Sequence, residues 1–115
     1  MHLNPPDHRI LAILRERKTI AVVGCSPNPS RDSHEIAQLL LRLGHRVIPI
    51  NPTSTEILGQ RCHGSLAEVP ERIDMVDVFR RPEFVPEIVE EVITLGSPIL
   101  WLQLGVIHEA AARRA

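Results

Sequence analysis

The chain has 115 residues, of which 43% are hydrophobic and 23% are charged, and its formal net charge is −1. This length and balance predict one soluble globular domain, and the absence of a charged block argues against a nucleic-acid-binding surface. Aromatic residues make up only 3% of the chain, which disfavours base stacking, and no apolar run is long enough to span a membrane.

The N-terminal residues predict a helix and no targeting signal. Residues 1–7 lack the apolar stretch of a signal peptide, so we expect a cytoplasmic protein whose Cys25 and Cys62 stay reduced. Asn4, followed by two prolines, is typical of a helix start, and apolar residues then recur at helical spacing. We expect residues 1–17 to form a helix that packs on the rest of the domain.

The segment of residues 18–31 is the most informative part of the chain. An apolar run that ends at Gly24 predicts a strand buried on both faces. The loop from Gly24 to Arg31 then leads into an amphipathic helix. Such a turn places backbone N–H groups, small side chains and one arginine where an anionic ligand binds. The glycines of the G-x-G-x-x-G dinucleotide signature are absent, which argues against an ordinary NAD site.

Helices and strands alternate through the rest of the chain. A helix from Asp32 or Ser33 to Gly44 is predicted, and we expect its inner face to carry Ile36, Leu39, Leu40 and Leu43. A strand over residues 46–50 follows, and Pro49 within it is typical of a strand near a binding rim. Residues 56–66 are irregular, with at most one short edge strand.

A further strand, helix and strand complete the pattern. We predict strands over residues 73–79 and 99–104, separated by a helix from Pro82 to Gly96 whose inner residues are Val85, Ile88, Val89 and Val92. Glu90 and Glu91 are interpreted as a solvated helix face, and a last helix begins at His108. This order predicts a Rossmann-like α/β fold, a doubly wound parallel sheet in three α/β/α layers, from which one edge strand is missing.

Ligands of such sheets bind beyond the carboxyl ends of the strands. In this sequence those positions hold small polar residues and arginines, and no acidic residue before Asp32 and Glu56. Because arginine and helix N-termini suit phosphate oxygens, we expect a phosphate-rich ligand, although polar loops are ordinary in any fold. Asn51-Pro52 replaces the acid that an NAD site places after the second strand, and no P-loop is present.

Other candidate residues favour structural roles. Cys25 is interpreted as a small residue that fills its turn rather than a reactive thiol. Asp74 and Asp77 lie three apart on one strand and therefore face opposite sides. The six histidines show no zinc-ligand spacing, so we expect neither a metal site nor a catalytic residue.

Five segments, taken in order, closely resemble one family. They are residues 20–31 (IAVVGCSPNPSR), 47–52 (VIPINP), 56–59 (EILG), 74–82 (DMVDVFRRP) and 101–105 (WLQLG). The chain resembles the small CoA-binding domain proteins, which are similar to the N-terminal CoA-binding domain of the succinyl-CoA synthetase α subunit. The synthetase's phosphorylated histidine lies in a domain outside this resemblance, so ligase activity is not implied.

The resemblance implies one CoA-binding domain over residues 1–115 whose ligand is coenzyme A or an acyl-CoA. It assigns the CoA phosphates to Gly24, Ser26 and Arg31, with Ser33 at the helix start; the adenosine end to Asn51 and Pro52; and the crevice toward the pantetheine arm to Phe79, Arg80, Gln103 and Gly105. Two alternatives stay open: a CoA-dependent ligase or transferase half-site completed by a partner chain, and a domain that binds NAD or another nucleotide. A homodimer or a protein partner is also compatible with the sequence.

Overall fold

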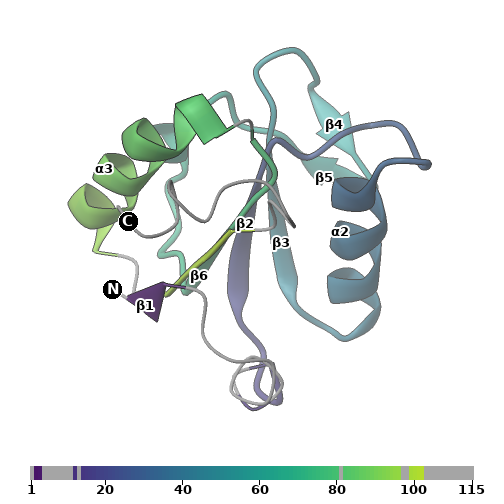
Figure 1. Cartoon of the computed structure of the whole chain (residues 1–115). Coiled ribbons are helices and arrows are strands. Elements are labelled where there is room, and N and C mark those ends of the chain that lie inside the picture. Colours follow the sequence, from purple (N-terminus) through teal and green to yellow (C-terminus); the bar gives the residue numbers. More distant parts are fainter. Residues whose placement is uncertain (1, 4–11, 13, 81, 97–98, 103–115) are drawn as a thin grey trace.

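A parallel five-stranded sheet forms the centre of the molecule (Figure 1). The structure, a computed structural model, describes residues 2–3, 12, 14–80, 82–96 and 99–102. The strands lie in the order β1 (His2–Leu3), β7 (Ile99–Leu102), β6 (Met75–Val78), β2 (Thr19–Val23) and β3 (Arg46–Ile50), and every neighbouring pair is parallel. Helix α2 (Asp32–Arg42) covers one face and α3 (Val85–Leu95) covers the other. The predicted Rossmann-like α/β fold is confirmed.

Three short strands modify the prediction. Residues 2–3 form β1, which pairs with β7, so the edge position predicted to be missing is occupied and these two residues are not helical. Strands β4 (Glu56–Ile57) and β5 (Gln60–Arg61) form an antiparallel hairpin, where only one short strand is predicted. Most of the predicted N-terminal helix and the whole helix from His108 lie outside the described residues.

The strand order reverses at β2, and this reversal creates the crevice in which a ligand would bind. From β2 the chain passes through α2 to β3 on one side. It then returns through the hairpin and a 3-10 turn, η1 (Leu66–Glu68), to β6 on the other side of β2. The two connections cover opposite faces of the sheet and leave a switch point at the carboxyl ends of β2 and β6.

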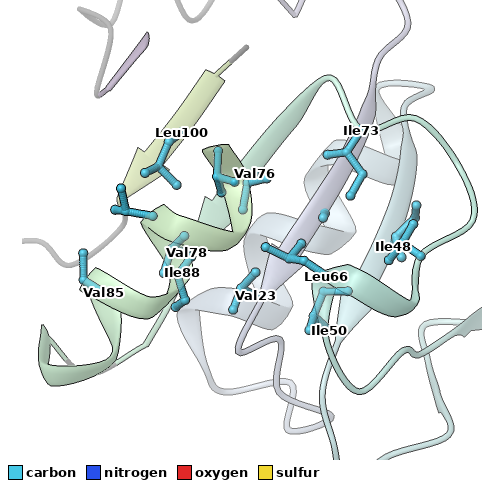
Figure 2. Packing of buried hydrophobic residues seen from close by; sticks show 14 residues of the cluster. Val23, Ile48, Ile50, Leu66, Ile73, Val76, Val78, Val85, Ile88 and Leu100 are labelled. Carbon is cyan, nitrogen blue, oxygen red and sulfur yellow. The ribbon is translucent and has the colours of Figure 1, made fainter. Parts of the chain in front are cut away.

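Two hydrophobic clusters fill the layers on either side of the sheet. Figure 2 shows the cluster between the sheet, η1 and α3, where Leu66 and Ile88 meet Val23 and Val78. All four α3 residues predicted to face inward are buried. The second cluster lies against α2. Because both faces are covered, the central strands are apolar without alternation, as predicted.

The inner face of α2 differs from the prediction. Leu40 is only 2% exposed, as expected, but Leu39 is 49% and Leu43 is 58% exposed. The buried residues besides Leu40 are Ser33, His34 and Ala37. Small residues at 33 and 37 let the first turns of the helix lie close to the sheet, which turns the helix so that Leu39 and Leu43 flank the contact instead of entering it.

Pro49 lies on β3, the strand at the end of the sheet order. Its carbonyl accepts a hydrogen bond from His63 N–H at 3.0 Å, and Asn51 N–H donates to the His63 carbonyl at 2.9 Å. A proline nitrogen on this outer side removes no hydrogen bond to β2, which explains why the ladder tolerates it. In the part of the chain that the structure describes, no helix is both long and apolar enough to cross a bilayer.

Candidate functional site

Gly24 lies at the switch point, directly after β2 and close to the residue that follows β6. Its φ is +80°, a conformation that side chains rarely adopt, and a Cβ at this position would lie 2.6 Å from the Phe79 carbonyl oxygen. Phe79 N–H in turn donates to the Val23 carbonyl at 2.8 Å. Glycine is therefore required here both by the turn and by the neighbouring strand end.

The loop after Gly24 is held in one shape by its own side chains. Ser33 is buried and its Oγ accepts a hydrogen bond from Ser26 N–H at 3.0 Å. The Ser26 Oγ accepts from Asn28 N–H at 3.0 Å, and Asn28 Oδ1 accepts from both the N–H and the hydroxyl of Ser30. A loop ordered in this way loses little entropy when a ligand binds.

The loop leads directly into α2, so the N-terminus of this helix lies next to the loop. Arg31 is the N-cap residue, and its side chain makes no capping hydrogen bond. Its carbonyl accepts from the N–H groups of His34 and Glu35, while its own side chain is exposed. The positive end of the helix and the exposed Arg31 guanidinium thus lie at this edge of the sheet, together with the acidic Asp32 and Glu35 of the first turn.

The side chain of Asn51 is committed to the protein itself. Its Nδ2 donates to the Cys25 carbonyl at 2.9 Å, and its Oδ1 accepts from Thr53 and Ser54 N–H groups. Asn51 therefore joins the end of β3 to the loop after β2. These hydrogen bonds give the Asn51 side chain a structural role, and its assignment to the adenosine end stays a prediction from the family resemblance.

A groove opens beside Gly24 on the α3 side of the sheet. Its volume is about 140 Å³, which is below the range of sites that enclose a whole small molecule. Its lining comes from the ends of β2, β3 and β6, from the segment before η1 and from α3: Val23, Gly24, Ile50, Pro52, Gly64, Ser65, Leu66, Arg80, Glu87, Ile88 and Glu91.

Arg80 lines the groove and lies close to Gly24, where the loop begins. Its guanidinium carbon lies 4.4 Å from the centre of the Phe84 ring, a cation–π contact that orients the side chain. Its Cδ would lie 3.1 Å from a Cβ at Gly24. Arg80 therefore crosses the entrance between the two parts of the site, while Phe79 is half-buried and packs toward the α2 side.

The contribution of α3 to the groove was not predicted. Glu87 and Glu91 both line it, and they are neighbours on one helix face because they lie four residues apart. Glu90 is exposed, as interpreted from the sequence, whereas Glu91 is half-buried. The four-residue spacing was the available signal.

Burial disfavours the thiolate form of the two cysteines, which lie in the hydrophobic cluster on the α2 side of the sheet. Burial, together with the nearby Cys62 and Asp77, raises the pKa of the Cys25 thiol to about 12. Burial and Glu56 also raise the pKa of Cys62. Both cysteines are free and buried, so Cys25 fills its turn as predicted.

The remaining candidates are dispersed. Asp74 lies at the amino end of β6 and its Oδ2 accepts from Thr19 N–H at 2.8 Å, whereas Asp77 is fully buried further along the strand. Among the described residues, no three metal-binding side chains are close enough to hold an ion. Gln103 and Gly105, assigned to the crevice from the sequence, lie outside the described residues.

The sequence and the fold both match known proteins. A family model described as the CoA binding domain matches residues 18–115. The uncharacterized protein YneT of Bacillus subtilis is 42% identical over 108 residues, which are 94% of this chain and 80% of that protein. A solved structure of a hypothetical protein from Pyrococcus horikoshii has a TM-score of 0.85 at 37% identity, and the match covers 96% of this chain and 78% of that one.

Larger enzymes contain a related region. The ADP-forming acetate–CoA ligase I of Archaeoglobus fulgidus is 34% identical over 74 residues, 64% of this chain but only 11% of the ligase. The dinucleotide-forming acetyl-coenzyme A synthetase 1 of Ca. Korarchaeum cryptofilum matches with a TM-score of 0.70 at 30% identity, covering 78% of this chain and 20% of the synthetase. The chain therefore spans a small fraction of these enzymes.

Proposed function

We propose that this chain, which belongs to the CoA-binding domain family, binds coenzyme A or an acyl-CoA in the cytoplasm and performs no chemistry of its own. The ligand would lie across the switch point, with its diphosphate over the loop of residues 24–33. Backbone N–H groups at the start of α2 would donate to the phosphate oxygens, and Arg31 would add a charged contact.

The observation that carries this proposal is the N-terminus of α2. Arg31 does not cap the helix with its side chain, and the N–H groups of His34 and Glu35 donate to its carbonyl, so those of Asp32 and Ser33 are left to another acceptor. The loop that leads there is already ordered by Ser26, Asn28 and Ser33. An anion bound at this point would gain from the helix dipole without first ordering the chain.

Calorimetric titration with CoA tests this arrangement. We expect Arg31→Ala to weaken binding by about 1.5–3 kcal/mol, the scale of a charged hydrogen bond. Arg42→Ala is the matched control, because Arg42 is exposed in the last turn of the same helix and its loss changes the net charge equally. If both variants bind CoA as tightly as the wild type, the phosphates lie elsewhere.

A second candidate is a half-site of a CoA-dependent ligase or transferase. The observation in its favour is that the acetate–CoA ligase of A. fulgidus contains a related region within a much longer chain. In that case a second chain would supply the reacting groups. Acyl transfer by the purified protein after addition of CoA and an acyl donor would favour this candidate over a binding module.

A third candidate, NAD binding, is separated by direct competition. A site built for CoA should prefer it to NAD and to dephospho-CoA, because only CoA carries the ribose 3′-phosphate. Equal affinity for NAD would favour a general nucleotide-binding domain instead.

A further inference from the structure

Three apolar residues on the outer side of α2 follow the spacing of a coiled-coil seam. Ile36, Leu39 and Leu43 lie three and then four residues apart, so their side chains form one stripe along the helix. Ile36 is half-buried, and Leu39 and Leu43 are exposed. On α3 the exposed Ile93 and Leu95 are only two residues apart, so they point to different sides. The stripe on α2 is therefore a continuous apolar surface that a partner can cover.

A charged edge runs beside this stripe. Glu35 and Arg42 are both exposed and lie seven residues apart, so they share one side of α2 two turns from each other. Their separation along the helix axis is about 10 Å. The acidic residue belongs to the first turn of the helix and the basic residue to the last. Residues that flank an apolar seam in this way form the ion pairs between the helices of a coiled coil.

This pattern is complementary to itself when a second copy runs in the opposite direction. In an antiparallel pair with a two-fold axis close to Leu39, Glu35 of each copy lies level with Arg42 of the other. The two Leu39 side chains then meet near the axis, and Leu43 packs beside Ile36 of the other copy. A parallel pair would place each residue level with its own copy and so bring like charges together. The charges therefore favour a second copy of this chain, in the antiparallel direction.

We infer that the outer face of α2 is the contact surface of a symmetric dimer, in which two copies of the chain pack through antiparallel α2 helices. One pair of short helices buries less surface than a stable dimer needs, so the dimer is weak and reversible, with a dissociation constant on the order of 100 μM. The contact does not use the N–H groups of Asp32 and Ser33. The inference is therefore independent of the proposed function.

Sedimentation velocity over about 5–500 μM protein, a range that brackets this constant, tests the inference. We expect the wild type to pass from monomer to dimer. Leu39→Gln/Leu43→Gln should stay monomeric, because glutamine keeps the helix propensity and removes the apolar stripe. Ile93→Gln/Leu95→Gln is the matched control, since these residues are also exposed but lie on α3, and it should associate as the wild type does. Circular dichroism establishes that both variants are folded.

A charge exchange tests the antiparallel direction. Glu35→Arg and Arg42→Glu each bring like charges together in the dimer, so we expect each variant alone to associate about threefold to tenfold more weakly than the wild type. An equimolar mixture of these two variants restores opposite charges at both ion pairs. The double variant Glu35→Arg/Arg42→Glu restores them within one protein. Both should associate about as strongly as the wild type.

The inference is overturned if the wild type stays monomeric over the whole range. It is also overturned if Leu39→Gln/Leu43→Gln still dimerises, or if the α3 control loses association equally. Single charge variants that associate as the wild type does, or a mixture and a double variant that do not regain association, would contradict the antiparallel pairing. None of these results bears on CoA binding, which calorimetry measures separately.

Discussion

Replacement of Gly24 is the substitution whose effect on stability the structure predicts most clearly. In Gly24→Ala the new methyl group would meet the Phe79 carbonyl at 2.6 Å in a left-handed backbone conformation. We expect a loss of about 2–4 kcal/mol in the free energy of unfolding, from backbone strain and overpacking together. Urea denaturation of the variant and the wild type measures this loss.

Gly59 provides the control for this prediction. Its φ of +75° is close to that of Gly24, but nothing lies within 4 Å of an added Cβ. Gly59→Ala should therefore cost only about 1–2 kcal/mol of conformational strain. Equal losses in the two variants would mean that β2 and β6 do not approach at Gly24 as described.

Cys25 should be unreactive in the folded protein. Burial raises its thiol pKa to about 12, so the thiolate that reacts with iodoacetamide is scarce near neutral pH. We expect both cysteines to resist alkylation natively and to react rapidly in denaturant, as followed by mass spectrometry. Fast native labelling of Cys25 would show that the turn opens or that the thiol is solvated.

His45 should make the protein sensitive to mild acid. Burial and the nearby Lys18 lower its pKa, and its Nδ1 accepts a hydrogen bond from Lys18 N–H at 3.1 Å. Because the unfolded chain binds this proton more readily, its contribution to stability is present above pH about 6.5 and is lost as the pH falls toward the folded pKa.

His45→Asn tests this pH dependence, since Asn Oδ1 can accept the same hydrogen bond without titrating. We expect the free energy of unfolding to fall less between pH 7 and pH 5 in the variant than in the wild type. The same slope in both proteins would assign the acid sensitivity to other groups.

The turn of residues 24–31 between β2 and α2 was predictable from the sequence, because a strand, a glycine and a helix start are local signals. The sequence could not show what Asn51 or Glu91 do. The hydrogen bond from Asn51 to Cys25 joins residues 26 positions apart, and Glu91 meets the groove only because α3 packs beside the β2 end. Such pairings depend on the tertiary arrangement.

At the scale of elements, α2 offers a direct test of helix rotation. Leu40 is 2% exposed and its neighbour Leu39 is 49% exposed. We expect Leu40→Ala to cost about 2–5 kcal/mol in the free energy of unfolding, and Leu39→Ala to cost about 1 kcal/mol or less. Equal costs, measured by urea denaturation, would indicate that α2 is rotated as the sequence pattern alone suggested.

The inner face of α2 was predicted wrongly for one reason. Large apolar residues at 36–43 are too frequent for periodicity to define a single buried face, and the small residues at 33 and 37 decide which face packs on the sheet. On α3 the apolar spacing is unambiguous, and its predicted inner face was right. The two-residue strand β1 gives no pattern of its own and exists only through its pairing with β7.

At the scale of the whole molecule, ligand binding should increase the free energy of unfolding. A ligand present at a hundred times its dissociation constant stabilises the folded state by about 2.7 kcal/mol, which for a chain of this size raises the melting temperature by about 10 °C. We expect CoA to produce this shift in a thermal melt and NAD at the same concentration to produce none. A larger shift with NAD would contradict the proposed ligand class.

The fold was predictable at this scale because alternation of strands and helices leaves few arrangements of a parallel sheet. The groove could not be predicted. Its lining combines strand ends with η1 and α3, and the sequence does not show that these parts of the chain meet. Leu66 and Ile88 belong to the same buried cluster and both line the groove.

A crystal structure of the protein with bound CoA tests the central claim most directly. The account predicts density for the diphosphate against the N–H groups of Asp32 and Ser33 at the start of α2, with Arg31 in contact, and the pantetheine arm beside Arg80. Density for the cofactor at the amino ends of the strands, near Thr19 and Asp74, would contradict it.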